Sequence, residues 1–144
     1  MAGPARTGAA RQPAAGDSPS EFVEQMYLAV VEEHWLWEVP LGLSDGRGGY
    51  EHGPWNPAEC SRQLVAWFDA GLLELYTDPP DDAPRPQNVA EWRAWHKGRY
   101  RVEDDPGIAR AVLADPSRWT GSPGDGFLRL APTDAGMAPD AAWV

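Results

Sequence analysis

The chain has 144 residues, enough for one compact domain and too few for two comfortable ones. Its formal charge is −10, and residues 20–76 carry ten acidic residues and two arginines, a net charge of −8. This negative field repels phosphate backbones, so the composition argues against a nonspecific binder of nucleic acid. The single cysteine, Cys60, excludes an intramolecular disulfide.

Residues 1–17 are rich in Ala, Gly, Pro and Arg and lack apolar periodicity, which predicts a disordered tail. The tail holds no hydrophobic stretch of signal-peptide type, and no apolar run in the chain reaches membrane-spanning length. We therefore expect a cytoplasmic protein with one domain over residues 18–140.

A capping box at Ser18-Pro19-Ser20-Glu21 predicts the start of the first helix. Pro40 is expected to end it. Residues 42–54 form a glycine-rich connection that is long for a structureless loop, so it is expected to be mobile or functional. The apolar stripe of the first helix has helical spacing and consists of Val23, Tyr27, Val30, His34 and Trp37, with Met26 beside it.

The second helix is predicted over residues 57–69, with Asn56 as its cap and Pro57 in its first turn. Gly71 can take the left-handed conformation that closes a helix. A short apolar strand follows at 72–76. The buried face of the second helix is predicted to comprise Cys60, Leu64, Trp67 and Phe68.

Two more helices are expected before the last strand. Asn88 to Glu91 forms a cap signal for a short helix that carries Trp92 and Trp95. Asp105-Pro106 predicts another helix start, and Asp115-Pro116 predicts its end. The inner face of that helix is expected to comprise Ile108, Ala111 and Val112.

The final strand is predicted from the alternation that begins at Leu128, and residues 132–136 have turn chemistry. This strand is the natural partner for residues 72–76, since both are short and apolar. The expected fold class is therefore α+β and mostly helical, with a two-stranded antiparallel hairpin and a helical insertion between its strands.

The stretch from Ala70-Gly71-Leu72-Leu73-Glu74-Leu75 resembles the end of the recognition helix and the first wing strand of winged-helix proteins. The later run from Phe127 to Gly136 is similar to their second wing strand. The resemblance implies a winged-helix (winged helix-turn-helix) domain with about fifty residues inserted between its wing strands. The alternative is another helical fold in which the same strands pair.

Three kinds of binding site follow from these elements. A winged helix that reads DNA would use Arg62 and Gln63 on the second helix and Arg129 on the wing. A Trp-lined pocket for a flat or cationic ligand would use Trp35, Trp37 and Trp55. A basic-aromatic stretch could hold a partner, and it comprises Trp92, Arg93, Trp95, His96, Lys97, Arg99 and Arg101.

Sites for catalysis, metals and cofactors are not expected. His34, His52 and His96 share no metal-ligand spacing, and Cys60 lies on an apolar helix face where burial is expected. No nucleophile sits beside a base, and the glycines at 42–53 lack the phosphate-binding pattern. The leading interpretation is a small non-catalytic regulatory or interaction protein that binds another protein or a second copy of itself, with a DNA-binding regulator as the alternative.

Overall fold

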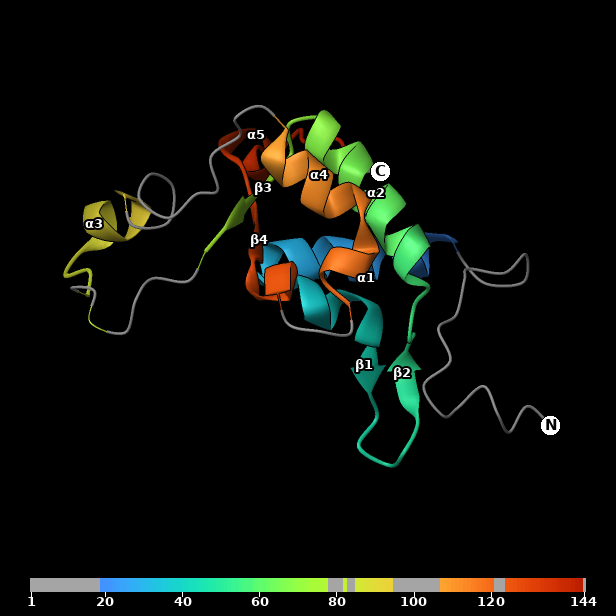
Figure 1. Cartoon of the computed structure of the whole chain (residues 1–144). Coiled ribbons are helices and arrows are strands. Elements are labelled where there is room, and N and C mark those ends of the chain that lie inside the picture. The colour runs from blue at the N-terminus through green and yellow to red at the C-terminus, as the bar shows by residue number, and fades with distance from the viewer. Residues whose placement is uncertain (1–18, 78–81, 83–84, 95–106, 121–123, 144) are drawn as a thin grey trace.

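The computed structural model describes residues 19–77, 82, 85–94, 107–120 and 124–143 (Figure 1). The predicted tail over residues 1–17 and the cap residue Ser18 lie outside this part of the chain. The fold is α+β, as predicted, with helices and two separate two-stranded antiparallel sheets. One continuous hydrophobic core joins the first helix, the second helix, the later strand pair and Trp143.

The first helix, α1 (Pro19–Val31), begins where predicted and ends earlier than predicted. Glu33 adopts a left-handed φ of 58°. The Glu33 amide donates to the Val30 carbonyl at 3.0 Å, and the His34 amide donates to the Ala29 carbonyl at 2.9 Å. This pair of bonds is the Schellman ending of a helix. The prediction that the helix continued through His34 and Trp37 to Pro40 is therefore wrong.

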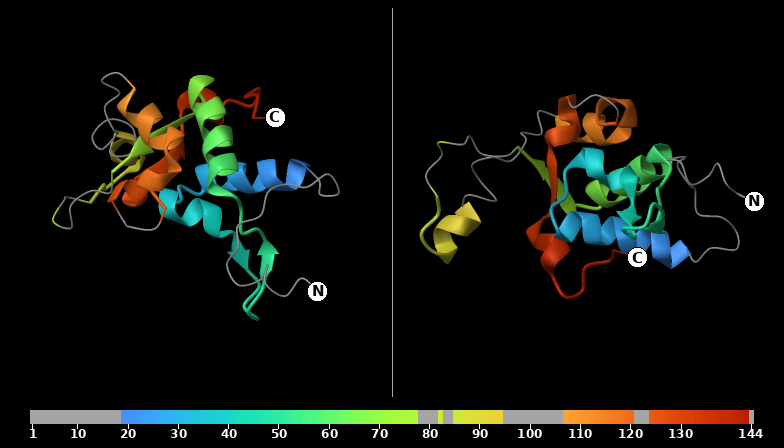
Figure 2. Two further views of the ribbon diagram at one scale, coloured as in Figure 1. Left: turned by 45° about the vertical axis from the view of Figure 1, so that its right-hand side comes forward. Right: turned by 90° about the horizontal axis from the view of Figure 1, so that it is seen from below.

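The chain next forms a short 3-10 helix, η2 (Leu36–Leu41), which contains Pro40. The glycine-rich segment that follows is a β-hairpin, β1 (Leu43–Ser44) and β2 (Tyr50–His52), rather than a structureless loop. The Asp45 carboxylate accepts from the Arg47 amide at 2.7 Å and from the Gly49 amide at 3.1 Å, which closes the turn. The hairpin projects from the body of the molecule in both Figure 1 and Figure 2.

The second helix, α2 (Pro57–Asp69), matches its prediction. The Asn56 side chain accepts from the Ala58 and Glu59 amides, as an N-cap should. Gly71 closes the helix with a φ of 78°. Its buried side comprises Cys60, Ser61, Leu64 and Trp67, whereas Phe68 is half-buried at the edge of the core.

The predicted pairing of the two apolar strands is confirmed. β3 (Leu73–Tyr76) pairs antiparallel with β4 (Arg129–Pro132), in a register that sets Leu75 opposite Leu130. Trp35 adds an isolated antiparallel bridge to Arg129 on the other side of β4. The Leu36 amide donates to the Leu128 carbonyl at 2.9 Å, and the Leu130 amide donates to the His34 carbonyl at 3.0 Å. β4 is therefore bonded on both sides.

The described part of the segment between β3 and β4 contains helices, as expected. It contains α3 (Val89–Ala94), α4 (Ile108–Ala114) and the 3-10 turns η4 (Pro116–Arg118) and η5 (Gly124–Phe127). Asn88 caps α3 by accepting from the Glu91 amide at 2.9 Å, and Asp115 follows the end of α4, both as predicted.

The predicted start of α4 is wrong, and two of the three residues predicted for its inner face are exposed. Its N-cap is Gly107, with a φ of 83°, and not Asp105. Val112 is buried as predicted, together with Ala109 and Leu113, whereas Ile108 is 46% exposed and Ala111 is also exposed. Because the helix begins later than expected, its inner face is displaced along the sequence. The run expected to be only a turn contains a short helix, α5 (Asp134–Met137).

Among the tryptophans whose side chains the structure describes, four belong to the core: Trp55, Trp67, Trp119 and Trp143. Three of them donate their indole N–H to a backbone carbonyl. Trp67 donates to Trp143, Trp119 to Val112, and Trp143 to Gly136, at 2.8, 2.8 and 2.9 Å. These bonds remove the cost of burying the polar end of each ring. The packing of Trp143 extends the ordered core past residue 140.

Candidate interaction surfaces

The outer side of α2 is where the DNA-reading residues were predicted. Arg62 is exposed there, but its guanidinium lies 2.6 Å from the Glu59 carboxylate, one turn earlier. Asp69 stands at the end of the same helix. Gln63 is half-buried. The cationic head of Arg62 is thus partly neutralised before any phosphate could approach.

Another helix, α4, packs across α2. α4 lies beside it in Figure 1, with the Ser61 hydroxyl donating to the Leu113 carbonyl at 2.5 Å. Arg110 of α4 binds Asp69 with two parallel hydrogen bonds, Nε to Oδ1 at 2.8 Å and the terminal nitrogen to Oδ2 at 3.0 Å. These bonds lower the pKa of Asp69 and raise that of Arg110. One flank of α2 is therefore covered by α4.

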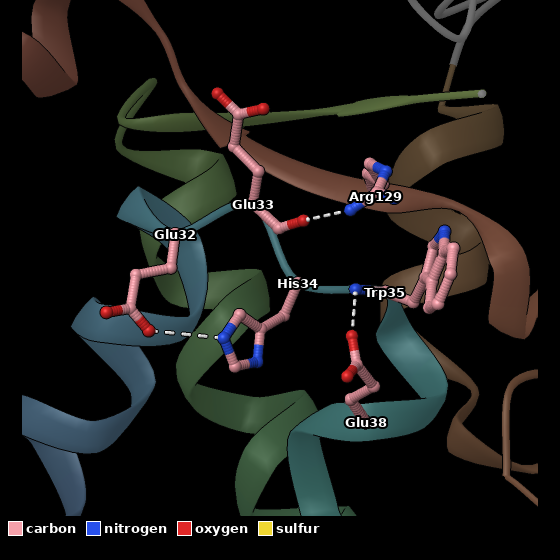
Figure 3. A network of polar contacts seen from close by, with 6 residues as sticks. All are labelled: Glu32, Glu33, His34, Trp35, Glu38 and Arg129. Atoms are coloured by element: carbon pink, nitrogen blue, oxygen red, sulfur yellow. Dashed lines mark hydrogen bonds and ion pairs between the residues drawn. The ribbon is translucent and has the colours of Figure 1, made fainter. Parts of the chain in front are cut away.

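The third predicted DNA contact, Arg129, faces the start of η2 (Figure 3). Its guanidinium donates to the Glu33 backbone carbonyl at 2.9 Å and lies 4.5 Å from the centre of the Trp35 ring. The Trp35 amide in turn donates to the Glu38 carboxylate at 3.0 Å. Arg129 thus connects β4 to the turn after α1. It belongs to a different element from Arg62, which lies on α2.

The three tryptophans of the predicted pocket divide into two places. Trp35 and Trp37 stack at 6.0 Å between ring centres, and the ring of Phe127 meets Trp35 edge-on at 5.8 Å. Trp55 is buried and packs edge-on against Phe22 at 5.2 Å. Within the described residues, the buried indole N–H of Trp37 has no hydrogen-bond partner.

The β1–β2 hairpin presents apolar side chains to solvent. Leu43 is 49% exposed and Tyr50 38%, and Leu41, at the end of η2 just before the hairpin, is 52% exposed. The base of the hairpin is anchored, because His52 Nδ1 lies 3.0 Å from the Glu21 carboxylate of α1 and the Trp55 amide donates to the Pro40 carbonyl at 2.8 Å. An apolar surface is thus carried on a short arm with a fixed base.

Most of the predicted basic-aromatic stretch cannot be placed in this fold. Trp92 and Arg93 belong to α3, where the structure describes the backbone but not these side chains. Trp95, His96, Lys97, Arg99 and Arg101 lie outside the described residues.

The titratable side chains provide little that resembles catalytic chemistry in the described part of the chain. Burial raises the pKa of the Cys60 thiol to about 12, so the thiol stays protonated near neutral pH. His34 pairs with Glu32 at 3.2 Å on the surface. Among the described residues, no group of three or more histidine, cysteine or acidic side chains could hold a metal ion.

No family model, curated protein or solved structure matches this chain. None of the helices in the described ranges is long and apolar enough to cross a membrane.

One surface has no counterpart among the sequence predictions. It is a groove between α1 and the residues after β4, and Tyr27, Met137 and Trp143 contribute to its lining. The available signal was the pair Thr133-Asp134, which matches a helix start; the Thr133 hydroxyl accepts from the Gly136 amide at 3.0 Å. The sequence analysis predicted only a turn at residues 132–136, so it missed α5, the helix that forms one wall of the groove.

Proposed function

We propose that this protein is a small non-catalytic interaction module, built on a winged-helix-like arrangement, that binds another protein. The arrangement is supported by the order α1, η2, α2, β3 and β4, with β3 paired to β4. A winged helix has a short helix before its recognition helix, and η2 (Leu36–Leu41) precedes α2 here. The β1–β2 hairpin stands between those two helices, and α3 and α4 stand between the wing-like strands.

The packing of α4 across α2 is the observation that carries the proposal. Ser61, buried on α2, is bonded to the backbone of α4, and Asp69 is bonded to Arg110. A helix that reads DNA must enter a groove about 12 Å wide and bring cations to the phosphates. α2 has a neighbouring helix on one flank, and its exposed Arg62 is paired with an acid. These features favour a protein partner over DNA.

The exposed hairpin supplies the contact surface in this proposal. Surfaces that bind proteins concentrate apolar and aromatic side chains at their centre. Leu43 and Tyr50 meet this description on an arm that projects from the body, and the exposed Leu41 lies just before this arm (Figure 1). The chain that docks there is a partner protein or a second copy of this one.

A titration with duplex DNA tests the choice between the two classes of partner. Fluorescence anisotropy of a labelled random duplex, at low salt, should remain unchanged as the protein is added. Nonspecific dissociation constants of DNA-binding proteins are about 10⁻⁴–10⁻⁶ M even at physiological salt. A salt-dependent rise in anisotropy in that range, weakened by Arg62→Ala, would support the DNA-binding regulator instead.

Affinity capture with matched variants tests the protein partner. A tagged wild-type chain, Leu43→Lys and Ile108→Lys are compared, because residues 43 and 108 are exposed to a similar degree and lie on different elements. The proposal expects one protein to be retained by the wild type and by Ile108→Lys and lost with Leu43→Lys. That protein must then bind again when both are purified, and sedimentation velocity identifies a second copy of the chain. Equal retention by all three variants would contradict the role of the hairpin.

A further inference from the structure

A groove runs between α1 and the segment that follows β4. Its volume is about 750 Å³, within the range of natural binding pockets. The right-hand view of Figure 2 shows the C-terminal segment passing along α1. The apolar part of its lining includes Val23, Tyr27 and Val31 on α1 and Met137, Pro139 and Trp143 on the C-terminal segment.

Several contacts hold the wall formed by the C-terminal segment in place. The Trp143 ring packs edge-on against Tyr27 at 5.1 Å and against Trp67 at 5.0 Å. Its indole donates to the Gly136 carbonyl, and its own carbonyl accepts from the Trp67 indole. A side chain at Gly136 would collide with the Leu72 carbonyl and the Trp143 ring. The groove is therefore formed before any ligand arrives, which lowers the entropy lost on binding.

The charged residues of the lining are both acidic. Glu24 is exposed and Glu33 is half-buried, and the lining includes no lysine or arginine. The exposed Glu24 carboxylate gives this part of the groove a negative charge that attracts cations. The same groove repels a phosphate or an acidic segment. Its charge and its apolar walls therefore complement a ligand that is both basic and apolar.

We propose that this groove binds an amphipathic segment of a partner protein, with apolar residues facing Tyr27, Met137 and Trp143 and with Lys or Arg beside Glu24. An amphipathic helix in an apolar groove is a recurrent mode of recognition. This inference rests on the proposed protein-binding function and adds a second contact, away from the β1–β2 hairpin. It specifies the chemistry of the partner, which the hairpin does not.

Two synthetic peptides test the inference on the full-length protein. Each has about 14 residues, near the mean helix length, with leucines at helical spacing. One carries Lys on its polar face and the other carries Glu. The Lys peptide is expected to bind at least about tenfold more tightly than the Glu peptide, as measured by anisotropy. In nitrogen-15 NMR spectra it should shift the Trp143 indole and Met137 amide signals.

Matched substitutions separate the groove from general attraction to an acidic protein. Met137→Arg, at a position 65% exposed, should weaken the Lys peptide at least about tenfold, whereas Ile108→Arg, 46% exposed and outside the lining, should not. Glu24→Lys should weaken binding more than Glu51→Lys, which makes the same charge change at an exposed position on β2. Equal effects within either pair would overturn the inference.

Other results would also overturn it: no binding of the Lys peptide, shifts confined to the hairpin, or displacement of the peptide by tetramethylammonium with the same signals affected. The last would indicate a site for small organic cations. If partner capture still depends on Leu43 while the groove variants have no effect, only this inference fails. If no protein partner is captured at all but the peptide binds as described, the proposed function fails and the groove stands.

Discussion

Two regions of this molecule expose very different surfaces on elements that are neighbours in sequence. α2 lies against the core on one side and against α4 on a flank, and its polar groups are largely bonded within the chain. The β1–β2 hairpin directly before it has an anchored base but exposes Leu43 and Tyr50. The contrast indicates that α2 has a structural task, and it leaves the exposed side chains of the hairpin for the binding role that we propose.

The largest expected effect lies on the buried side of α2. Trp67→Ala should lower the free energy of unfolding by about 3–5 kcal/mol, because it removes a large buried ring. Trp67 is 4% exposed and also donates to the Trp143 carbonyl at 2.8 Å. Chemical denaturation measures the change. Trp67→Phe keeps much of the packing and should cost less, while a melting temperature lowered by only a degree or two in Trp67→Ala would contradict the packing of this helix.

The contact between α2 and α4 provides the next effect. Ser61→Ala should cost about 1–3 kcal/mol, because the Leu113 carbonyl, near the end of α4, loses its buried donor. The Ser61 hydroxyl is 2.5 Å from that carbonyl in the folded protein. Ala66→Ser, on the exposed side of α2, is the matched control and should change stability by no more than about 0.5 kcal/mol. Equal costs for the two variants would mean that α4 does not cover Ser61.

A substitution on the exposed hairpin, unlike those on the buried side of α2, should leave the stability almost unchanged. Leu43→Lys is expected to change the free energy of unfolding by less than about 0.5 kcal/mol, because the side chain is half-exposed already. Leu75→Lys, at a position 1% exposed in β3, should prevent folding, since it buries an unpaired charge. Denaturation curves compare the two variants with the wild type. A large loss of stability in Leu43→Lys would place the hairpin in the core rather than at a binding surface.

The smallest effect concerns the ion pair between the two helices. The Arg110 guanidinium lowers the pKa of the Asp69 carboxyl. A lowered pKa contributes stability that is present above the ordinary pKa of an aspartate and is lost as the pH falls through the lowered value. Carbon-13 NMR titration should therefore find Asp69 ionised at a lower pH than an ordinary aspartate, and Arg110→Gln should return it to the ordinary range. If the titration midpoint of Asp69 is the same in Arg110→Gln as in the wild type, the Asp69–Arg110 ion pair does not contribute to the contact between α2 and α4.

Two helix ends explain why sequence analysis succeeded in one place and failed in another. α1 and α2 both finish with a left-handed residue and the same pair of backbone bonds. In α2 this residue is Gly71, and a glycine at this point of the sequence predicts the helix end. In α1 it is Glu33, which rarely takes that conformation on its own. The adjoining bonds of His34 and Trp35 to β4 connect this turn to a strand almost a hundred residues away, so no local pattern could predict it.

The same distinction holds for the sites. The pairing of residues 73–76 with 129–132 followed from two apolar strands that each needed a partner. The covering of α2 by α4 did not, because the inner face of α4 depends on Gly107 starting the helix later than Asp105-Pro106 suggested. The hairpin was hidden because its glycines resemble those of a loop. Its turn is closed by the Asp45 carboxylate, which is bonded to the Arg47 and Gly49 amides, and by the Asp45 amide, which donates to the Gly49 carbonyl. The groove beside α1 required residues from both ends of the domain.

The packing of α4 against α2 is the claim on which the proposed function depends most. Nuclear Overhauser spectra of the full-length protein, labelled with nitrogen-15 and carbon-13, test it directly. Cross-peaks between the β protons of Ser61 and the protons of Leu113 are expected, because the hydroxyl and the carbonyl lie 2.5 Å apart. The packing would be contradicted if the spectra showed intact β3–β4 contacts but no contacts between α2 and α4. That result would favour α2 as a DNA-reading helix.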